Sequence, residues 1–439
     1  MSTELQPAQE PPNEAPPDTL GQSGTAAEAA RVAAPEIIAE SLGDYARIWF
    51  KRLRNGESGA LPVLIGLIAI IVYFQARNSL FLSAGNLVNL LIQGAPFIML
   101  GMAEVFVLLL GEIDLSIGFN AAIGAVFTAW LAFSVPWWVA ILAGLAVTTV
   151  IGAVQGALIT RLRLPSFVVT LAGLLGLQGL MIVLVARSGH GPGGTIPISN
   201  KIIDDLTSGN LSPVAGWVVM LVLVCLSVVF MVLRDRRRRA SGLVVPPTGI
   251  TAIKAAVMVV AGVVVVLVGN TNRGVTAAVS LRGVPWIVLI VLGLLGLWTA
   301  LLTRTRFGRY VYAIGGNAEA ARRAGVNLIR IRTLAFTLTG LTAGAAGIVY
   351  ASRLGSISTN TDGGQLVLFA VASAVIGGTH LFGGRGKMLH ALLGGLVVAA
   401  IYNGLGLLGM SAAATDIVTA LVLLAAVTVD ALARGRSAQ

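Results

Sequence analysis

The sequence contains few of the residues on which most protein chemistry depends. Among its 439 residues there is one cysteine, Cys225, and charged residues make up only 11% of the chain. A single cysteine cannot form an internal disulfide, and the histidines at 190, 380 and 390 have no metal-ligand spacing. Soluble domains carry roughly a quarter charged residues, so the scarcity of charge excludes an ordinary soluble domain.

Motifs for nucleotide binding and hydrolysis are also absent. The segment GGRGK (383–387) resembles the end of a phosphate-binding loop, but the pattern G-x-x-x-x-G-K-[ST] needs a glycine and a hydroxyl where the chain has Leu381 and Met388. No Ser/His/Asp arrangement has motif-like spacing. We therefore expect a chain that is not an enzyme and binds no cofactor. Residues 1–35 contain no apolar core, so no signal peptide is expected.

Long apolar runs make up most of the sequence. Hydrophobic residues make up 56% of the chain and the mean hydropathy is +0.88, values typical of a polytopic membrane protein. The sequence predicts an all-α fold of about 12 transmembrane helices, with a range of about 10–12, since an apolar helix of about 20 residues crosses the bilayer. The predicted spans are 59–76, 88–110, 117–134, 136–159, 166–186, 213–233, 252–269, 284–303, 333–351, 365–381, 388–409 and 415–433.

The distribution of lysine and arginine predicts the orientation of these spans. With the N-terminus in the cytoplasm, 24 of the 30 basic residues fall on the cytoplasmic side, as the positive-inside rule requires. Both termini are then cytoplasmic, and 434–439 form a short cytoplasmic tail. The same rule accounts for the net charge of +11 without a nucleic-acid partner.

Two segments precede the transmembrane domain at 59–433. Residues 1–35 are rich in proline, glutamate and alanine, which predicts a disordered acidic leader in the cytoplasm. In residues 36–58 the apolar positions recur at steps of three and four, and basic residues follow them. This pattern predicts an amphipathic helix on the inner membrane surface.

One polar segment, 304–332, lies between two predicted spans and holds seven arginines against a single acid, Glu319. Inside it, residues 317–323 predict a short helix, with Asn317 as N-cap. Glu319 lies in the first turn, where negative charge suits the helix dipole, and Gly325 is a suitable stop. A small helix on the basic face of a membrane protein predicts contact with a soluble partner.

Carboxylates interrupt the apolar sequence at LLGEIDLSIG (109–118), which contains Glu112, Asp114 and Ser116. Breaks of this kind are tolerated at membrane depth only where the backbone faces protein or water. One interpretation is therefore a bent element that lines a path or sets the structure. The other is an ordinary loop between two spans, with Asp114 or Ser116 as the N-cap of the second helix.

Four motifs in order resemble the membrane permease subunit of bacterial ABC sugar importers, in the ribose/xylose/galactoside branch. They are LLGEIDLSIG (109–118), ALITRLRLPSFVVTLAG (157–173), RTRFGRYVYAIGGNAEAARRAGVN (304–327) and AVIGGTHLFGGRGKMLHALLGGLVVAAIYNGLGLLG (374–409). The resemblance runs from about residue 80 to the end and is strongest to the larger, xylose-type permeases. Against the compact members, 234–282 reads as an insertion with extra spans, and Gln155 stands where the family pattern has asparagine.

The resemblance implies a permease subunit of the bacterial inner membrane that forms the path of an ATP-driven sugar importer by alternating access, with a pentose such as xylose favoured. Segment 304–332 becomes the cytoplasmic coupling loop. The residues that would contact the ATPase are Gly316, Asn317, Glu319, Ala320, Ala321, Arg322 and Gly325. The implied partners are an ABC ATP-binding subunit, which hydrolyses ATP, an extracytoplasmic sugar-binding protein, and a second permease copy in the lipid bilayer.

Two alternatives stay open. An ABC permease for nucleosides or branched-chain amino acids belongs to the same superfamily. A stand-alone ion-coupled secondary transporter fits twelve spans and could use Glu104 or Asp416 as a proton site. Glu104 lies in mid-span and needs neutralisation by Arg163 or by a neighbouring polar side chain.

Overall fold

The computed structural model describes residue 47 and residues 61–189, 194–242, 245, 247–274 and 280–435. The predicted leader at 1–35 lies outside these residues. So do the predicted interfacial helix at 36–58, apart from Arg47, and residues 436–439 of the predicted tail.

The described chain is almost entirely helical. In order, the elements are α3 (Leu61–Arg77), α4 (Ala84–Leu108), α5 (Ile117–Leu131), α6 (Trp137–Arg161), α7 (Ser166–Arg187), β1 (Thr195–Pro197), α8 (Lys201–Ser208), α9 (Pro213–Ala240), α10 (Thr248–Asn270), α11 (Trp286–Arg304), α12 (Arg306–Gly316), α13 (Ala318–Arg323), α14 (Leu328–Leu354), β2 (Ser356–Ser358), α15 (Gly363–Ile376), α16 (Met388–Leu407) and α17 (Ala412–Gly435).

The long helices follow the predicted apolar runs. Among the described residues, eight helices are long and apolar enough to cross a membrane, namely α4, α6, α7, α9, α10, α11, α14 and α16. Shorter apolar helices occupy four further predicted positions: α3, α5, α15 and the Ala413–Val422 part of α17. The all-α, polytopic character is confirmed. The count of about twelve spans and the cytoplasmic position of both termini stay predictions.

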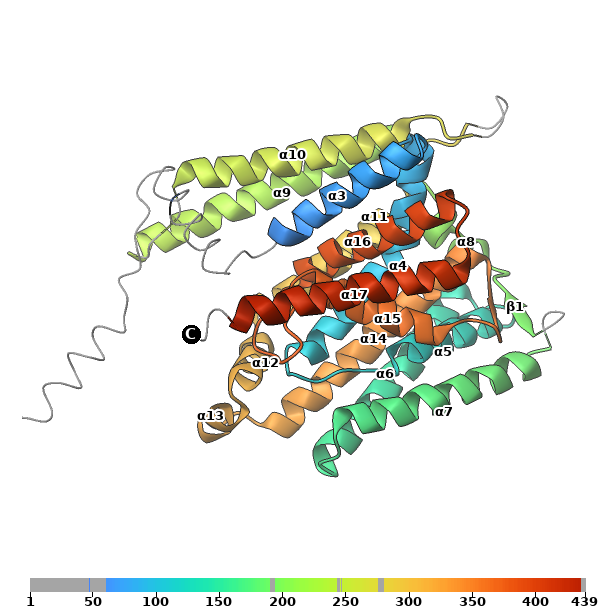
Figure 1. Cartoon of the computed structure of the whole chain (residues 1–439), viewed down its shortest axis with the longest axis vertical. Helices are drawn as coiled ribbons and strands as arrows, with labels where there is room; N and C mark the ends of the chain where they lie inside the picture. The colour runs from blue at the N-terminus through green and yellow to red at the C-terminus, as the bar shows by residue number, and fades with distance from the viewer. Residues whose placement is uncertain are drawn as a thin grey trace, which may run out of the picture.

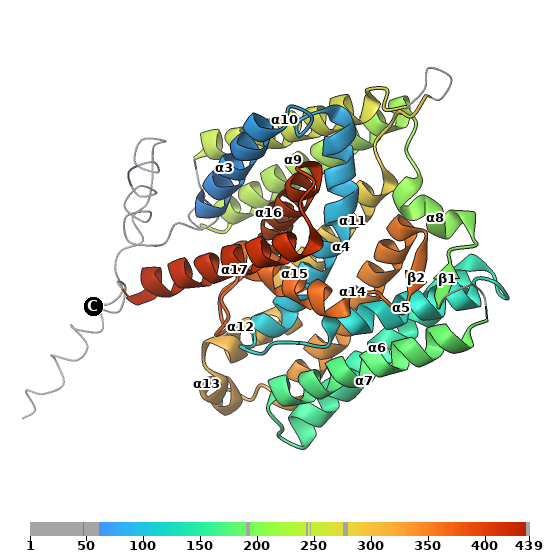
Figure 2. The same cartoon turned by 45° about the vertical axis from the view of Figure 1, so that its right-hand side comes forward.

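The two ends of the bundle differ (Figures 1 and 2). Helices α3, α9 and α10 lie along one side and α5, α6 and α7 along the other, with α4, α14, α15 and α16 between them. Helices α12 and α13 project at one end, which we call the α13 end. Helix α8 and the antiparallel β1–β2 pair cover the other end, which we call the α8 end.

Helix α4 is the most buried of the long apolar helices, and α14 lies beside it at the centre of the bundle. From Gln93 to Leu108, every residue of α4 is buried. Helix α14 packs closely on α6, because Gly340 of α14 and Gly152 of α6 bring the two backbones together and leave no room for a Cβ atom. Close backbone approach through small residues is the usual way in which helices pack in lipid. Helices α4 and α14 therefore form the closely packed centre of the bundle.

Candidate functional site

Helix α13 forms at the position that the sequence predicts. The Asn317 side chain accepts a hydrogen bond from the backbone N–H of Ala320 at 2.9 Å, which is the expected N-cap. The helix ends at Arg323, and Gly325 has a φ of +82°, a conformation that favours glycine. The predicted cap and the predicted stop are both confirmed.

Four of the six residues of α13 are exposed, whereas Ala318 and Ala321 pack toward the bundle. Exposed residues among those predicted to contact a partner are Gly316, Asn317, Glu319, Ala320, Arg322 and Gly325. Ala321 is buried and packs against the bundle, because one face of even a short helix must pack against the chain that carries it. The contact of these residues with an ATP-binding subunit stays a prediction.

Glu319 orders the charged face of α13. Arg322 donates two hydrogen bonds to its carboxylate, at 2.9 and 3.0 Å, and Arg323 donates a third at 3.1 Å. These contacts hold the pKa of the Glu319 carboxyl below its usual range, so Glu319 remains ionised throughout the physiological pH range. Exposed ion pairs add little stability; their effect here is to fix a pattern of charge on a projecting helix.

Helix α12 was missed as a separate element. Its signal is the apolar series Phe307, Val311 and Ile314, at steps of four and three, within the arginine-rich segment. In the structure Val311 and Ile314 are buried, whereas Arg306 and Arg309 are exposed. The predicted coupling loop is therefore two consecutive helices, the first of which packs on the bundle.

Helix α12 contacts two loops that are far apart in the sequence. We call residues 109–116, which join α4 to α5, the carboxylate loop, and residues 377–387, which join α15 to α16, the glycine loop. The Tyr312 hydroxyl of α12 donates to the carbonyl of Gly386 at 2.8 Å, and the N–H of Gly384 donates to the carbonyl of Leu109 at 2.9 Å. Gly315 lies so close to both loops that a Cβ atom would overlap the Leu109 carbonyl. The two loops and α12 form one assembly.

The carboxylate loop is buried and internally hydrogen-bonded. Asp114 accepts from the backbone N–H of Ser116 at 2.9 Å and from its hydroxyl at 2.6 Å, and Gln155 donates to that hydroxyl at 2.8 Å. Ser116 is the N-cap residue of α5, but its side chain makes no capping hydrogen bond; its hydroxyl instead donates to Asp114 and accepts from Gln155. The predicted cap is right in position and wrong in its bonding. Gln155, noted above as a departure from the family pattern, is part of this network.

The other two acids have different partners. Glu104 is fully buried and accepts from the backbone N–H of Asp114 at 3.2 Å. Arg163, which is also among the described residues, is exposed and forms no ion pair with Glu104, so a neighbouring polar group, and not this arginine, contacts the acid. Glu112 lies 3.0 Å from Nε of Arg332, although the N–H direction does not meet hydrogen-bond geometry. Burial raises the pKa of Glu112 above its usual range, and the Arg332 charge opposes this shift.

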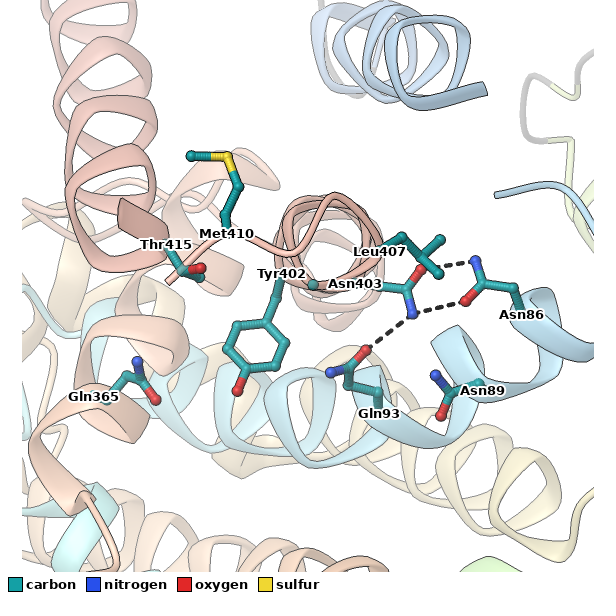
Figure 3. Close-up of a pocket in the computed structure, with 10 residues that line it drawn as sticks. Asn86, Asn89, Gln93, Gln365, Tyr402, Asn403, Leu407, Met410 and Thr415 are labelled. Carbon is teal, nitrogen blue, oxygen red and sulfur yellow. Dashed lines mark hydrogen bonds between the residues drawn. The ribbon is translucent and has the colours of Figure 1, made fainter. Parts of the chain in front are cut away.

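A polar pocket lies toward the α8 end (Figure 3). Its volume is about 380 Å³, and it lies between the N-terminal part of α4, the start of α15, the last turns of α16 and the segment that begins α17. The lining residues are Asn86, Asn89, Gln93, Gln365, Tyr402, Asn403, Gly406, Leu407, Met410 and Thr415. This pocket was not predicted from the sequence. Its only local signal is the amide series at 86, 89 and 93, which places three polar side chains on one face of an apolar helix.

An amide network holds one wall of the pocket. Asn403 of α16 exchanges two hydrogen bonds with Asn86 of α4, at 2.8 and 3.0 Å, and donates a third to Gln93 at 3.2 Å. Asn86 also donates to the carbonyl of Phe81 at 2.8 Å. These contacts join α4 to α16 within apolar surroundings, where a satisfied polar network specifies the helix register.

Comparison with known proteins places the chain in a transport family. Residues 86–427 match the family described as branched-chain amino acid transport system / permease component. The chain is 32% identical to the xylose transport system permease protein of Escherichia coli (strain K12) over 393 residues, which cover 88% of this chain and 95% of that one. It is 30% identical to the ribose import permease protein of Escherichia coli (strain K12) over 368 residues, 84% of this chain and 92% of that one.

A third relative matches a shorter stretch. The probable ABC transporter permease protein YphD of Escherichia coli (strain K12) is 43% identical over 157 residues, 36% of this chain and 47% of that one. No solved structure matches the chain. The resemblance drawn from four sequence motifs is confirmed by these relatives, two of which match over most of their length. The chain belongs to the permease family described as the branched-chain amino acid transport system / permease component.

Proposed function

We propose that this chain is the permease subunit of an ATP-driven importer of a pentose, such as xylose or ribose, and a multi-pass protein of the bacterial inner membrane. The observation that carries the proposal is the match to a xylose permease over 95% of that protein's length. A second relative of nearly full-length coverage is named for ribose, another pentose. The relative named as a probable ABC transporter permease supports ATP as the energy source.

The two alternatives are less well supported. The family description mentions branched-chain amino acids, but the relatives that match over most of the chain are named for sugars. A secondary transporter would need its proton sites on one path. Glu104 contacts the carboxylate loop, whereas Asp416 contacts Gln365 at the start of α15, so the two acids lie toward opposite ends of the bundle.

In the proposed mechanism the permease supplies geometry, and an ATP-binding subunit supplies energy. The exposed face of α13 contacts that subunit, and α12 transmits its movement to the carboxylate and glycine loops. These loops are continuous with α4, α15 and α16, so the movement reaches the helices that line the pocket at the far end. A binding protein delivers the sugar at the α8 end, and two permease copies together form the path.

The test is transport by the purified chain in liposomes, alone and with an ATP-binding subunit and a sugar-binding protein. We expect uptake of labelled D-xylose only with both partners and ATP. Uptake by the chain alone under a pH gradient would instead identify a secondary transporter. If the chain with its partners accumulates leucine and not D-xylose, the amino-acid alternative is correct.

A charge reversal on α13 tests the coupling step. Replacing Glu319 by lysine removes the partner of Arg322 and Arg323 and puts three positive charges together. We expect Glu319→Lys to abolish ATP-driven uptake while leaving membrane insertion intact, because the residue is exposed and supports no buried contact. Glu319→Gln, which keeps an acceptor for the arginines, is expected to retain part of the uptake. Normal transport by Glu319→Lys would count against α13 as the coupling element.

A further inference from the structure

We propose that the pocket between α4, α15, α16 and α17 is a contact site for the sugar on its way through the permease. This inference rests on the proposed function and extends it by naming residues on the path. The ligand class is a neutral polyhydroxylated molecule of pentose size. Some polar groups of the pocket are already hydrogen-bonded to one another, and others are free.

The lining side chains fall into two groups. Asn86 and Asn403 form hydrogen bonds with each other, with Gln93 and with a backbone carbonyl. These two side chains therefore hold α4 and α16 together along one wall of the pocket. Within the described part of the chain, the Asn89 amide and the Tyr402 hydroxyl form no hydrogen bond, although both residues line the pocket. Free donors and acceptors in a pocket are the groups that can exchange water for the hydroxyls of a ligand.

The free groups match an uncharged ligand. Every polar lining residue is an amide, a phenol or a hydroxyl, and none is ionised at neutral pH. Two charged groups lie nearby but do not line the pocket: the carboxylate of Asp416, which Gln365 holds at 2.6 Å, and Arg353, whose charge acts on Tyr402. The volume of about 380 Å³ lies within the usual range of small-ligand pockets, roughly 300–1,000 Å³. A pentose satisfies this chemistry because it carries several hydroxyls and no charge.

Tyr402 is held in place without using its hydroxyl. Its ring packs edge-on against Phe97 at 5.7 Å and Phe369 at 5.6 Å between ring centroids. These contacts fix the ring by its apolar surface, and the hydroxyl is left free at the pocket.

The pocket is mechanically connected to the α13 end. Of its four elements, α4 leads directly into the carboxylate loop, and α15 and α16 are joined by the glycine loop. Both loops contact α12 through the region around Gly315. A displacement of α12 therefore acts on three helices that carry pocket residues, as expected of a site whose access changes during transport.

Conservative substitutions with matched controls test the site. In the liposome assay with both partners and ATP, we expect Tyr402→Phe and Asn89→Leu each to raise the D-xylose concentration for half-maximal uptake, by roughly 3- to 10-fold per lost hydrogen bond. The controls are Tyr73→Phe on α3 and Gln178→Leu on α7, both exposed residues outside the pocket. These variants should change the D-xylose concentration for half-maximal uptake by less than about twofold. If the pocket variants and the controls reach half-maximal uptake at the same D-xylose concentration, the proposal is overturned.

A second measurement separates contact from a packing effect. In a Cys225→Ser background, Asn89→Cys and Gln178→Cys each supply one thiol. In the assembled complex, we expect D-xylose to slow the reaction of a maleimide at position 89 and not at position 178. Equal labelling with and without D-xylose at position 89 would overturn the proposal even if uptake by the variants were reduced. If the wild-type complex imports no D-xylose at all, the proposed function itself fails, a result distinct from either of these.

Discussion

Gly315 occupies a point where the backbones of three segments meet. A Cβ atom there would overlap the carbonyl of Leu109 and approach the N–H of Gly384 at 2.5 Å. Gly111 and Gly383, on the two facing loops, have φ values of +76° and +87°, which favour glycine. The adjacent Gly316 has open space where its Cβ would be. Two neighbouring glycines of one helix thus have very different structural requirements.

This contrast gives a residue-scale prediction. We expect Gly315→Ala to destabilise the purified chain by about 2 kcal/mol or more, because the added methyl group must push α12 away from both loops. Gly316→Ala should change stability by no more than roughly 0.5 kcal/mol. Thermal unfolding in detergent measures both. Equal unfolding temperatures for the two variants would show that α12 does not pack on the loops in this way.

Residue positions were predictable where their chemistry is local. Asn317 and Gly325 could be assigned from the sequence because an N-cap and a helix stop depend on neighbouring residues alone. The burial of Ala321 and the close contact of Gly315 with two loops were not predicted. Their roles depend on which distant segments pack against α12 and α13, and a capping rule does not contain that information.

At the scale of elements, α12 is the connection between α13 and the bundle. It carries Tyr312, whose hydroxyl bonds the glycine loop, and Tyr310, which is exposed on the same helix. Glu112 of the carboxylate loop also pairs with Arg332 near the start of α14. A force on α13 is therefore passed to the bundle on both sides of that short helix.

The two tyrosines of α12 supply an element-scale prediction. Tyr312→Phe removes one hydrogen bond, worth about 1 kcal/mol, between α12 and the glycine loop while keeping the ring. We expect a lower ratio of D-xylose transported to ATP hydrolysed, with ATP hydrolysis maintained. Tyr310→Phe, which removes an exposed hydroxyl, should leave the ratio unchanged. An equal fall in the ratio of D-xylose transported to ATP hydrolysed in both variants would argue against transmission through Tyr312.

Elements were predicted best where hydrophobicity alone defines them. The long apolar helices appear close to their expected positions, since the length of an apolar run is set by the bilayer. Helix α12 was overlooked because its apolar stripe is short and lies in a segment with seven arginines, two of them in the helix itself. The pocket was overlooked for a different reason: Asn86 and Asn403 are separated by most of the chain, and their pairing arises only when α4 packs on α16.

At the scale of the whole molecule, the α9–α10 hairpin is a peripheral layer (Figure 1). In the most apolar windows of α9 and α10, only 6% and 11% of the residues are buried, compared with 89% in α4. Such exposed apolar helices are stable only in a lipid environment or against another protein. Arginines at the last turn of α9 are suited to the cytoplasmic side.

The hairpin allows a direct test of the predicted orientation. In a Cys225→Ser background, Ser241→Cys places a thiol just after α9, and Thr271→Cys places one just after α10. We expect an impermeant maleimide to label position 271 in intact cells and position 241 only after permeabilisation. Labelling of both positions from one side would show that α10 does not cross the membrane, and the predicted count of spans would have to be revised.

The close backbone approach of Gly383 to Gly111 and Gly315 also bears on protein engineering. A designer who wishes to give this permease a different ATPase would naturally transplant the α12–α13 segment alone. The transplanted segment would carry a surface that fits two loops of the donor permease, and those loops would not be transplanted with it. Under the proposed coupling, the unit to exchange in a chimaera is discontinuous: residues 306–325 together with the carboxylate loop and the glycine loop.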